Sequence, residues 1–573
     1  MSLSGMRQCA IALLLLLTGL RQAPAEPIIR VGVVLNAASV TIRSSSEFTV
    51  EQRRTRSATF TTALALDPAA GGVLKPSDLQ YRLTVTIGAD TMLVLPLDAR
   101  VRIEPPGALL EIDDRAYRGA LEVFGNARHS LTVVDELPLE DYLRGVVPNE
   151  LSPAAFGQLE ALKAQAVAAR TYVERNLGQY RAEGYDVCTT DACQVYLGAK
   201  TEDPLATQAI AATRGVVATY EGKPINALYS STCGGRTEDA GNVFQEKIPY
   251  LVSVDCEYKH PRPQPFSSAR SIESWKDGVL ATAHVSTFAD AARFMGLPER
   301  GEPASLEPAP LAAFVRQTFY PAVSPPSDLS FLIEQGVLPA SGAPSRDDLL
   351  FRLIDRKSAF EWQQGVLTSW DGQQMRLIVN GQAKTYALAG DALIYQRVGD
   401  DRLPLRQGTW IGGELIEFRA EESVIPMLVF RINFANPAAD RYSRLAVWQT
   451  HKTRTELDTA IKSLAIGEFV DMRVVERGPS ERPIATEIVG STARKTVPAL
   501  RLRTLFGLRD SLVYFDIERN ARGAVLGATF YGRGWGHGVG MCQVGAYGMA
   551  LDGATYDEIL KKYYRGIELT TLY

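Results

Sequence analysis

One carboxylate stands directly before a helical pattern and is the first candidate for chemistry. Glu150 ends the run VVPNE, and Ser152 and Pro153 follow it, which is typical of a helix N-cap and first helical position. A carboxyl group in such a turn could act as a general acid or base. Apolar residues then recur at helical spacing: Phe156, Leu159, Leu162, Ala166, Val167, Val173 and Leu177. The alternative is a plain core helix whose polar residues, including Lys163 and Arg170, form a solvated face.

Two further carboxylates, Glu140 and Asp141, lie in the preceding segment LPLEDY. A pair of acidic residues would suggest glycoside hydrolysis by a general acid and a general base. The alternative is that both residues cap or flank a short helix that ends before Gly145. Both interpretations remain open at this point.

A glycine-rich segment near the end of the chain is the second place where chemistry is expected. Residues 530–546 read FYGRGWGHGVGMCQVGA, and no Gly-Lys-Ser/Thr follows, so the segment does not match a phosphate-binding loop. The glycines would let a polymer lie close to the backbone, with Trp535 and His537 presented from it. A lone histidine is usually structural, but glycines on both sides leave His537 without core neighbours in sequence. Either role is compatible with the pattern.

Two loops carry further polar groups. The segment DVCTTDACQVYLG at 186–198 offers Gln194 and Tyr196 for hydrogen bonding to a sugar or stacking on it, although both could equally be turn and core residues. The segment SSTCGGRT at 230–237 is a hydroxyl- and glycine-rich turn that could approach a ligand closely.

The first 25 residues resemble a secretory signal peptide. Arg7 supplies the positive charge, residues 11–17 the apolar run, and Ala23-Pro24-Ala25 a small-residue cleavage site. An uncleaved membrane anchor is the alternative. No later segment is apolar over ~18 residues, so a soluble exported protein is expected, in the periplasm, the cell wall or outside the cell. The net charge of −4 provides no electrostatic signal for nucleic-acid binding.

Export would place the cysteines in a compartment where disulfides persist. Cleaving the leader removes Cys9 and leaves Cys188, Cys193, Cys233, Cys256 and Cys542. The expected disulfides join Cys188 to Cys193 and Cys233 to Cys256, with Cys542 free. Zinc is the competing interpretation, but no histidine lies between residues 129 and 260, so a mixed Cys/His site would need a distant ligand. We therefore expect no metal and no cofactor.

Strand and turn patterns suggest several domains. Residues 26–135 are strand-rich, and 117–123 with 131–134 resembles a hairpin. From residue 261 to 365 the chain is proline-punctuated and partly helical. Residues 366–497 are expected to form a small β-barrel-like domain, with a hairpin turn at Asn380-Gly381. That domain shows no acid–histidine pair and no metal spacing, so a spacer or binding role is the default.

Seven segments together resemble the stage II sporulation protein D family, the SpoIID/LytB-type domain. They are VVPNE at 146–150, EALKAQAVAARTY at 160–172, CQVYLG at 193–198, STCGGRTED at 231–239, PYLVSVDC at 249–256, LRTLFGL at 502–508 and GRGWGHGVGMCQVGA at 532–546. The resemblance implies an α+β fold: a β-rich domain with a central helix, built from 26–260 and 498–573. The parts at 261–365 and 366–497 would be inserted into that domain.

The resemblance implies a peptidoglycan lytic transglycosylase that acts on glycan strands, preferentially strands without stem peptides. Glu150 matches the family's proposed catalytic glutamate, and Arg170 matches the helix arginine that could orient the glutamate or the sugar. A single acid suffices because the C6 hydroxyl of N-acetylmuramic acid is the nucleophile, and intramolecular delivery is worth ~10⁵ M or more in effective concentration. That acid needs a pKa near the working pH, which a partly apolar turn could provide.

Further groove residues implied by the resemblance are Lys163, Tyr229, Thr237, His537 and Gln543. This chain has Cys542 where serine is usual and Val544 where an aromatic residue is usual, so one stacking contact is lost. Some relatives have a histidine/cysteine zinc site near the 188–193 loop, but the histidines are absent here. The alternative function is a non-catalytic peptidoglycan-binding protein or an amidase enhancer, with a cell-wall amidase as partner.

Overall fold

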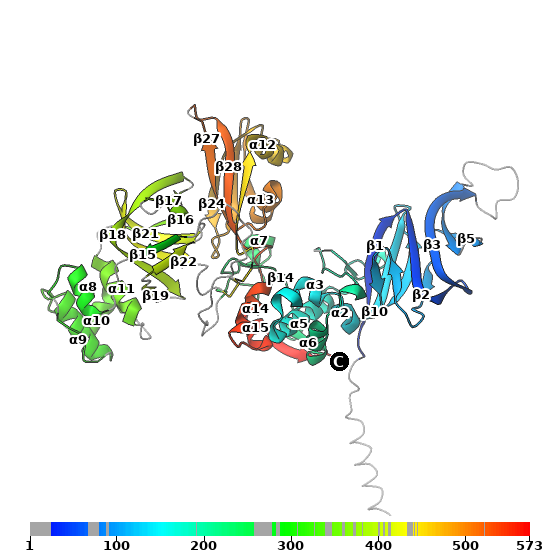
Figure 1. The fold of residues 1–573 in the computed structure, drawn as a ribbon, viewed down its shortest axis with the longest axis horizontal. Coiled ribbons are helices and arrows are strands. Elements are labelled where there is room, and N and C mark those ends of the chain that lie inside the picture. Colours follow the sequence, from blue (N-terminus) through cyan, green and yellow to red (C-terminus); the bar gives the residue numbers. More distant parts are fainter. Residues whose placement is uncertain are drawn as a thin grey trace, which may run out of the picture. The chain divides into compact units, whose positions relative to one another are not determined.

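The computed structural model describes residues 25–573 with gaps at 67–78, 88–90, 191, 257–277, 282–286, 299, 306, 326, 339–345, 358–360, 371–373, 381, 399–400, 405–406, 411–413, 433–438, 441, 444 and 521. The proposed signal peptide therefore lies almost entirely outside the described residues. The chain divides into two compact units. The first holds the described residues through Leu228 together with Thr555–Lys561 and Gly566–Tyr573, and the second holds Tyr229–Ala554 and Lys562–Arg565. The fold is mixed α+β and strand-rich (Figure 1).

Strands dominate the beginning of the first unit, as the alternating sequence patterns predict. They are β1 (Ile28–Ala37), β2 (Ser39–Val50), β3 (Arg53–Leu66), β4 (Leu79–Ile87), β5 (Thr91–Pro96), β6 (Val101–Ile103), β7 (Leu110–Ile112), β8 (Arg115–Tyr117), β9 (Ala120–Gly125), β10 (Leu131–Pro138), β11 (Val187–Cys188), β12 (Val216–Tyr220), β13 (Lys223–Pro224) and β30 (Glu568–Thr571). The sheets have the orders β11-β1-β10-β9-β6, β5-β4-β3-β2-β7-β8 and β13-β12-β30. The antiparallel β9–β10 pair confirms the predicted hairpin. Its strand β10 is buried over most of its length, including the polar Asp135.

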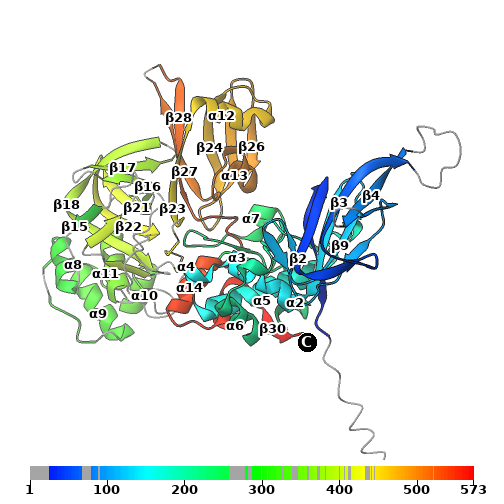
Figure 2. The ribbon, with the colours of Figure 1, turned by 45° about the vertical axis from the view of Figure 1, so that its right-hand side comes forward.

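The helices of the first unit follow β10 and are shorter than the sequence suggests. They are α2 (Leu139–Arg144), α3 (Val147–Glu150), α4 (Pro153–Phe156), α5 (Leu159–Asn176) and α6 (Pro204–Ala212), with 3₁₀ turns η2 (Arg181–Glu183) and η3 (Ala199–Thr201). Figure 2 shows α5 beside α2 and α6. The Asp203 side chain caps α6 by accepting hydrogen bonds from Leu205 N and Ala206 N. Pro204 occupies its first turn, where its missing N–H costs no hydrogen bond.

The single helix expected behind Glu150 is in fact two helices. Pro153 begins a separate short helix, α4, and α5 begins only after Gly157. The Ser152 side chain makes no capping hydrogen bond. Glu150 is the last residue of α3 and does not lie in a turn. The expected solvated face is also largely absent, because Gln165 and Arg170 are completely buried on α5.

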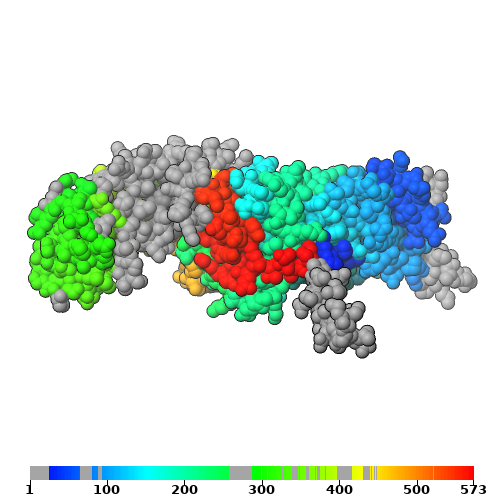
Figure 3. All heavy atoms as spheres, turned by 90° about the horizontal axis from the view of Figure 1, so that it is seen from below, coloured from blue at the N-terminus to red at the C-terminus, as the bar shows by residue number. Residues whose placement is uncertain are grey.

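The end of the chain returns to its beginning within the first unit. β30 pairs antiparallel with β12. The Tyr573 hydroxyl donates to Glu140 Oε1 at 2.6 Å, and Glu26 Oε1 accepts from the Glu140 amide at 2.8 Å. Figure 3 shows the last residues, in red, at the surface beside the first described residues, in blue. Glu140 therefore joins segments from both ends of the described chain.

The second unit contains the remaining elements. Its helices are α7 (Ala240–Phe244), α8 (Phe288–Phe294), α9 (Pro308–Phe319), α10 (Asp328–Glu334), α11 (Arg346–Lys357), α12 (Arg454–Ile461), α13 (Ala499–Phe506) and α14 (Gln543–Leu551), with the 3₁₀ turn η4 (Lys462–Leu464). Helix α15 (Tyr556–Tyr563) contributes residues to both units. The strands are β14 (Tyr229–Ser230), β15 (Gly278–Ala281), β16 (Gln363–Trp370), β17 (Gln374–Val379), β18 (Gln382–Val398), β19 (Asp401–Pro404), β20 (Gln407–Trp410), β21 (Glu414–Glu421), β22 (Val424–Ile432), β23 (Val447–Thr453), β24 (Phe469–Arg477), β25 (Pro483–Gly490), β26 (Arg494–Pro498), β27 (Val513–Arg519), β28 (Val525–Arg533) and β29 (Met541–Cys542).

The strands of 366–497 do not form the one β-barrel-like module expected from the sequence. The hairpin β17–β18 at Asn380 is present and belongs to a sheet of order β17-β16-β21-β22-β18-β19. β24, β25 and β26 form a separate sheet. β23 pairs with β28, which lies beyond residue 497. Pairing partners so distant in sequence are not visible in strand propensity, which explains the difference.

No helix among the described residues is long and apolar enough to span a membrane.

Candidate active site

Glu150 lies at the end of α3, and one of its oxygens is held by the backbone. The amide of Val195 donates to Glu150 Oε1 at 2.7 Å. Pro148 sits in the first turn of α3, where its missing N–H costs no hydrogen bond. The side chain of Asn149 donates to Gly145 O and to Thr201 Oγ1, which holds the short helix in place. Glu150 is half-buried, so a carboxyl group is oriented by the chain and still reaches the surface.

Two tyrosines surround this carboxylate. Burial, and then the negative charge of Glu150, raise the pKa of Tyr142 well above its ordinary value. The pKa of Tyr172 is also raised, by burial and by the charges of Tyr180 and Glu150. Both phenols therefore stay protonated at neutral pH. Neither tyrosine stood out in the sequence, because each occupies an ordinary core position of a helix.

The cysteine-bracketed loop delivers the Val195 amide to Glu150. Cys188 and Cys193 form a disulfide with their Cα atoms 5.5 Å apart. Residues 194–196 follow at once, so this short covalent loop lies directly beside the segment that contacts Glu150. Gly145 allows the segment to approach, because a Cβ at that position would lie 2.5 Å from the Tyr196 ring.

Gln194 and Tyr196 are buried, which corrects their assignment as sugar-binding residues. Gln194 accepts a hydrogen bond from the Tyr142 hydroxyl at 3.0 Å and donates to Ala169 O at 3.2 Å. The Tyr196 hydroxyl donates to Asp135 Oδ2 at 2.7 Å. Only 1% and 2% of these two side chains are exposed. They are the turn and core residues of the alternative interpretation, and they position the Val195 amide between them.

The buried Asp135 beneath Tyr196 leads to a prediction about pH. Burial raises the pKa of Asp135 from 3.8 to about 7, although hydrogen bonds from Tyr196 and Gly119 oppose the shift. Between the two values the folded chain holds a proton that the unfolded chain has lost, so stability falls as pH rises through this window. The loss between pH 6 and 8 is about 1.4 kcal/mol for a group with a folded pKa near 7. We expect Asp135→Asn to remove this contribution in urea denaturation at both pH values. Parallel pH profiles of the two proteins would contradict it.

Arg170 does not orient Glu150, contrary to the sequence-based expectation. Its Nε and Nη2 donate to the two oxygens of Glu140 at 2.9 and 2.7 Å, and its Nη1 donates to Val216 O. Burial opposes ionisation of Glu140, but the hydrogen bonds and charge of Arg170 outweigh it and lower the pKa of that carboxyl. Arg170 itself is completely buried. The pair is therefore a structural link between α5 and α2 and does not touch a reacting group.

Two of the other acidic and basic residues of this region are also engaged. Asp141 lies 3.5 Å from Arg144, and Lys163 lies 2.7 Å from Glu160. The Lys163 ammonium also stands over the Tyr556 ring at 5.8 Å. The expected acid pair Glu140 and Asp141 lies in the first turn of the short helix α2, which ends before Gly145. Glu150 remains the candidate acid of the first unit.

The expected site residues of the glycine-rich segment belong to the second unit. Trp535 is 46% exposed although it is a large aromatic residue, and its backbone pairs with Thr232 in an isolated bridge. It is presented to solvent, as the sequence predicts. Thr237 and Gln543 are buried, and the Thr237 hydroxyl accepts from Val254 N at 2.9 Å. These two are packing residues, which corrects their assignment to a groove.

His537 is neutral and held by the backbone. The Val539 amide donates to His537 Nδ1 at 3.1 Å, and the imidazole donates to the Tyr229 carbonyl. Burial, followed by the positive charges of Arg503 and Arg482, lowers the pKa of His537 to about 4. The imidazole is therefore not in the protonated, cationic form that would act as a general acid at neutral pH. It joins Tyr229 to the glycine-rich segment.

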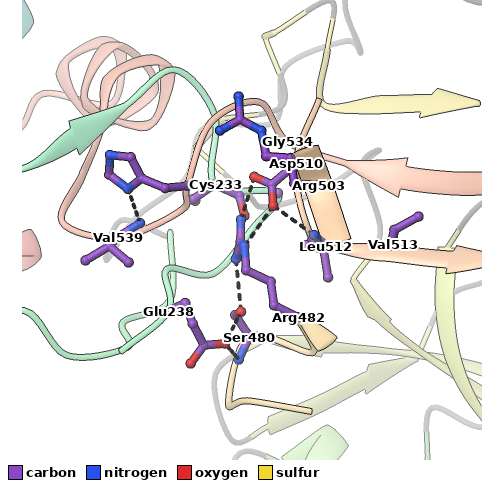
Figure 4. A network of polar contacts seen from close by, with 12 residues as sticks. Cys233, Glu238, Ser480, Arg482, Arg503, Asp510, Leu512, Val513, Gly534 and Val539 are labelled. Carbon is purple, nitrogen blue, oxygen red and sulfur yellow. Dashed lines mark hydrogen bonds and ion pairs between the residues drawn. The ribbon is translucent and has the colours of Figure 1, made fainter. Parts of the chain in front are cut away.

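A buried arginine that the sequence did not reveal supports the same segment. Arg482 forms an ion pair with Asp510 at 2.9 Å, both completely buried, and donates to Cys233 O and Ser480 Oγ (Figure 4). Gly538 is required beside it, because a Cβ there would lie 2.2 Å from the guanidinium carbon. Position 538, with φ of +71°, also favours glycine over other residues.

The second expected disulfide is absent. Cys233, Cys256 and Cys542 are free and buried in the structure. The three thiols share one space with Asp440, so Cys233 and Cys256 do not form an isolated pair. The sequence could not show this grouping, because Asp440 lies far from every cysteine along the chain.

Comparison with known proteins assigns a family to the region of Glu150. Residues 127–220 match the stage II sporulation protein family, and residues 407–540 match a domain of unknown function (DUF8618). The first match contains Glu150 and the disulfide loop. The chain therefore carries a stage II sporulation protein domain, which confirms the resemblance seen in its motifs. The second match covers part of the expected insertion, for which the sequence suggested no counterpart, and continues into the glycine-rich segment.

Three relatives illustrate the extent of the similarity. An uncharacterized protein of Brachyspira hyodysenteriae is 37% identical over 177 residues, which are 30% of this chain and 48% of that protein. Stage II sporulation protein D of Bacillus amyloliquefaciens is 35% identical over 205 residues, 30% of this chain and 57% of that protein. The amidase enhancer of Bacillus subtilis is 43% identical over 111 residues, 19% of this chain and 14% of that protein. The chain thus spans about half the length of the first two relatives.

Proposed function

We propose that the protein is an exported cell-wall enzyme, a lytic transglycosylase. Its substrate would be peptidoglycan glycan strands, and its product strands would end in 1,6-anhydro-N-acetylmuramic acid. The observation that carries the proposal is Glu150, a half-buried carboxylate oriented by the Val195 amide inside the matched domain. Export rests on the signal-peptide pattern of the first 25 residues.

The proposed reaction needs one acid. Glu150 in its protonated form donates its proton to the oxygen that links N-acetylmuramic acid to N-acetylglucosamine, and the bond from that oxygen to the anomeric carbon breaks. The C6 hydroxyl of the same muramic acid attacks the anomeric carbon, and its proton passes to the Glu150 carboxylate. The carboxyl group is thereby restored. No water is consumed and no second carboxylate is required, in contrast to hydrolytic glycosidases.

Each unit, taken by itself, offers a further group suited to the proposed reaction. Trp535 is an exposed aromatic on which a sugar ring can stack. In the first unit, the Val195 N–H donates to one oxygen of Glu150 and so orients its carboxyl group. We place the catalytic domain at 26–260 and 498–573, with 261–497 inserted. The preferred strands are those without stem peptides.

Product analysis tests the proposal. Purified protein lacking residues 1–25 is incubated with glycan strands stripped of peptides, and the products are examined by mass spectrometry. Anhydro-muramic ends, whose mass is lower than that of hydrolytic ends by one water, are expected. Reducing ends with the mass of hydrolysis products, or intact strands, would contradict the transglycosylase. A parallel reaction with peptide-bearing strands tests the substrate preference.

A second candidate function is a non-catalytic wall-binding protein that stimulates an amidase. It is favoured by the 43% identity to the amidase enhancer of Bacillus subtilis. Under this alternative the protein would bind strands without cleaving them and would raise the rate of a purified cell-wall amidase. Intact strands together with a stimulated amidase would establish it, whereas anhydro ends formed without the amidase would exclude it as the sole function.

The Cys188–Cys193 disulfide should support activity through Val195. The double variant Cys188→Ser/Cys193→Ser loosens the loop that directly precedes the Val195 amide, so Glu150 is held less firmly. We expect a decrease of kcat on the order of 10-fold, because small displacements of a catalytic group are costly. KM should change little, and hydrogen exchange at the Val195 amide should quicken. Unchanged exchange at that amide would show that the disulfide does not position Glu150.

A further inference from the structure

Four acidic groups from distant parts of the chain meet in the interior of the second unit. Cys233, Cys256 and Cys542 offer thiol sulfurs, and Asp440 offers a carboxylate oxygen. These four ligand atoms all lie within 4.8 Å of one another, and all four residues are buried. Cys233 Sγ lies 3.4 Å from Asp440 Oδ2. We call this set the Cys3Asp cluster.

We propose that the Cys3Asp cluster binds one divalent metal ion of the zinc class. In a tetrahedral zinc site, metal–ligand distances near 2.0–2.3 Å place the ligand atoms about 3.5–3.8 Å apart. The cluster needs only a small contraction to reach that spacing. Three thiolates select a soft ion such as zinc, and aspartate is an accepted oxygen ligand.

The burial and hydrogen bonding of the Asp440 carboxylate favour a bound cation in the Cys3Asp cluster. Its Oδ2 accepts hydrogen bonds from the amides of Gly234 and Gly235, at 2.7 and 3.1 Å. Its Oδ1 is buried and has no hydrogen-bond partner among the described residues. A buried carboxylate with an unsatisfied oxygen is unfavourable. A bound cation would neutralise that carboxylate, which a disulfide between two of the thiols would not do.

The surroundings of the sulfurs are those of metal-bound thiolates. Cys542 Sγ accepts from the amides of Cys233 and Gly545, at 3.2 and 3.3 Å, and it stands at the N-terminus of α14. Helix N-termini favour thiolates. The Tyr563 hydroxyl lies 3.0 Å from Cys256 Sγ. Such outer hydrogen bonds orient ligands and offset the charge of the thiolates.

The Cys3Asp cluster favours glycine at several neighbouring positions. A Cβ at Gly545 would lie 2.5 Å from Cys256 Sγ and 2.2 Å from the Tyr563 hydroxyl. Gly234 and Gly235 have φ of +74° and +98°, which favours glycine and turns their amides toward Asp440. The glycine-rich turn noted in the sequence thus serves the cluster.

The role of the ion would be structural. The ligands come from residues 233–256, from the segment before β23 and from the start of α14, so one ion joins three parts of the second unit. All four ligands are buried, which is typical of closed structural sites. Binding would release the thiol protons, three in all, as Zn²⁺ takes their place. This inference is independent of the glycan-cleaving activity proposed for Glu150.

Metal content and thiol titration test the proposal on the full chain without its leader. Protein purified without chelator from zinc-supplemented cells should contain about one zinc ion per chain by plasma mass spectrometry. After denaturation with chelator, three thiols should react with a thiol reagent, because only Cys188 and Cys193 are joined. Replacement of zinc by Co²⁺ should produce the thiolate-to-cobalt charge-transfer absorption of a tetrahedral site.

Matched cysteine variants locate the site. Cys542→Ser should lower the zinc content about tenfold, whereas Cys188→Ser/Cys193→Ser, which removes two cysteines outside the cluster, should leave it unchanged. Wild-type protein without zinc that fails to take up Zn²⁺ or Co²⁺ after reduction would overturn the proposal. So would a single reactive thiol, which indicates a disulfide, or equal zinc in wild type and Cys542→Ser. The wild-type measurements decide the matter even if a variant does not fold.

Discussion

Glu150→Gln is expected to abolish formation of anhydro-muramic ends while leaving the fold intact. General acid–base catalysis by one side chain contributes about 10²–10⁴-fold, and here a single group performs both proton transfers, so a loss toward the upper value is expected. Glutamine has the same shape and its amide oxygen can still accept the Val195 N–H, so the loop should keep its position. Initial rates on peptide-free strands, followed by mass spectrometry, measure the effect.

Neighbouring acids provide the matched controls for Glu150. Asp141→Asn changes a half-buried carboxylate that lies 3.5 Å from Arg144 on the preceding helix, and its rate should equal that of wild type. Glu150→Asp keeps the acid but shortens its reach, so it should retain less activity than wild type and more than glutamine. If Glu150→Gln and wild type release anhydro ends at the same rate, Glu150 is not the acid. Binding of strands by the glutamine variant should persist, which separates catalysis from folding.

The sequence predicted correctly those features that depend only on residues adjacent in the chain. The Asp203–Pro204 start of α6 and the Asn380 hairpin follow from capping and turn preferences, which depend on adjacent residues. The exposed Trp535 was likewise expected from its glycine-rich surroundings. The candidate acid could be chosen from its motif. Its hydrogen bond from the Val195 amide could not be predicted, because that amide lies 45 residues further along the chain and only the fold brings it near.

Residues whose role depends on a distant partner were misjudged. Gln194 and Tyr196 have side chains suited to sugars, but the structure buries them against Ala169 O and Asp135. A motif reveals residue type and spacing, and it does not reveal which side of a loop faces the core. Asp440 is the clearest case. It lies 207 residues from Cys233 in sequence, so no local pattern connects this carboxylate with the thiols that it approaches in the fold.

Arg170→Met is expected to destabilise the first unit by about 3–5 kcal/mol, because it leaves Glu140 charged and buried without its partner. The interaction is bidentate, and Arg170 is completely buried. The pKa of Glu140 is lowered in the folded chain, so its stabilisation is present above the ordinary carboxyl pKa and is lost as pH falls through the lowered value. In Arg170→Met this acid-dependent loss should disappear. Urea denaturation at neutral and acidic pH, with hydrogen exchange along α5, measures both effects.

Two control variants test whether the effect of Arg170→Met comes from the burial of the Arg170–Glu140 pair. One control breaks an exposed ion pair, and the other removes both partners of the buried pair. Lys561→Met removes a partner from an exposed pair with Asp557, 3.5 Å apart, and should change stability by less than ~0.5 kcal/mol. Arg170→Met/Glu140→Gln removes the unpaired charge and should recover part of the lost stability, since the cost of the single change is mainly that of the stranded carboxylate. Because the Tyr573 hydroxyl and the Gly215 amide also donate to Glu140, the double variant should not recover fully. If Arg170→Met were as stable as Lys561→Met, water would hydrate the Glu140 carboxylate in place of Arg170. Arg170 would then not be needed to hold α5 to α2.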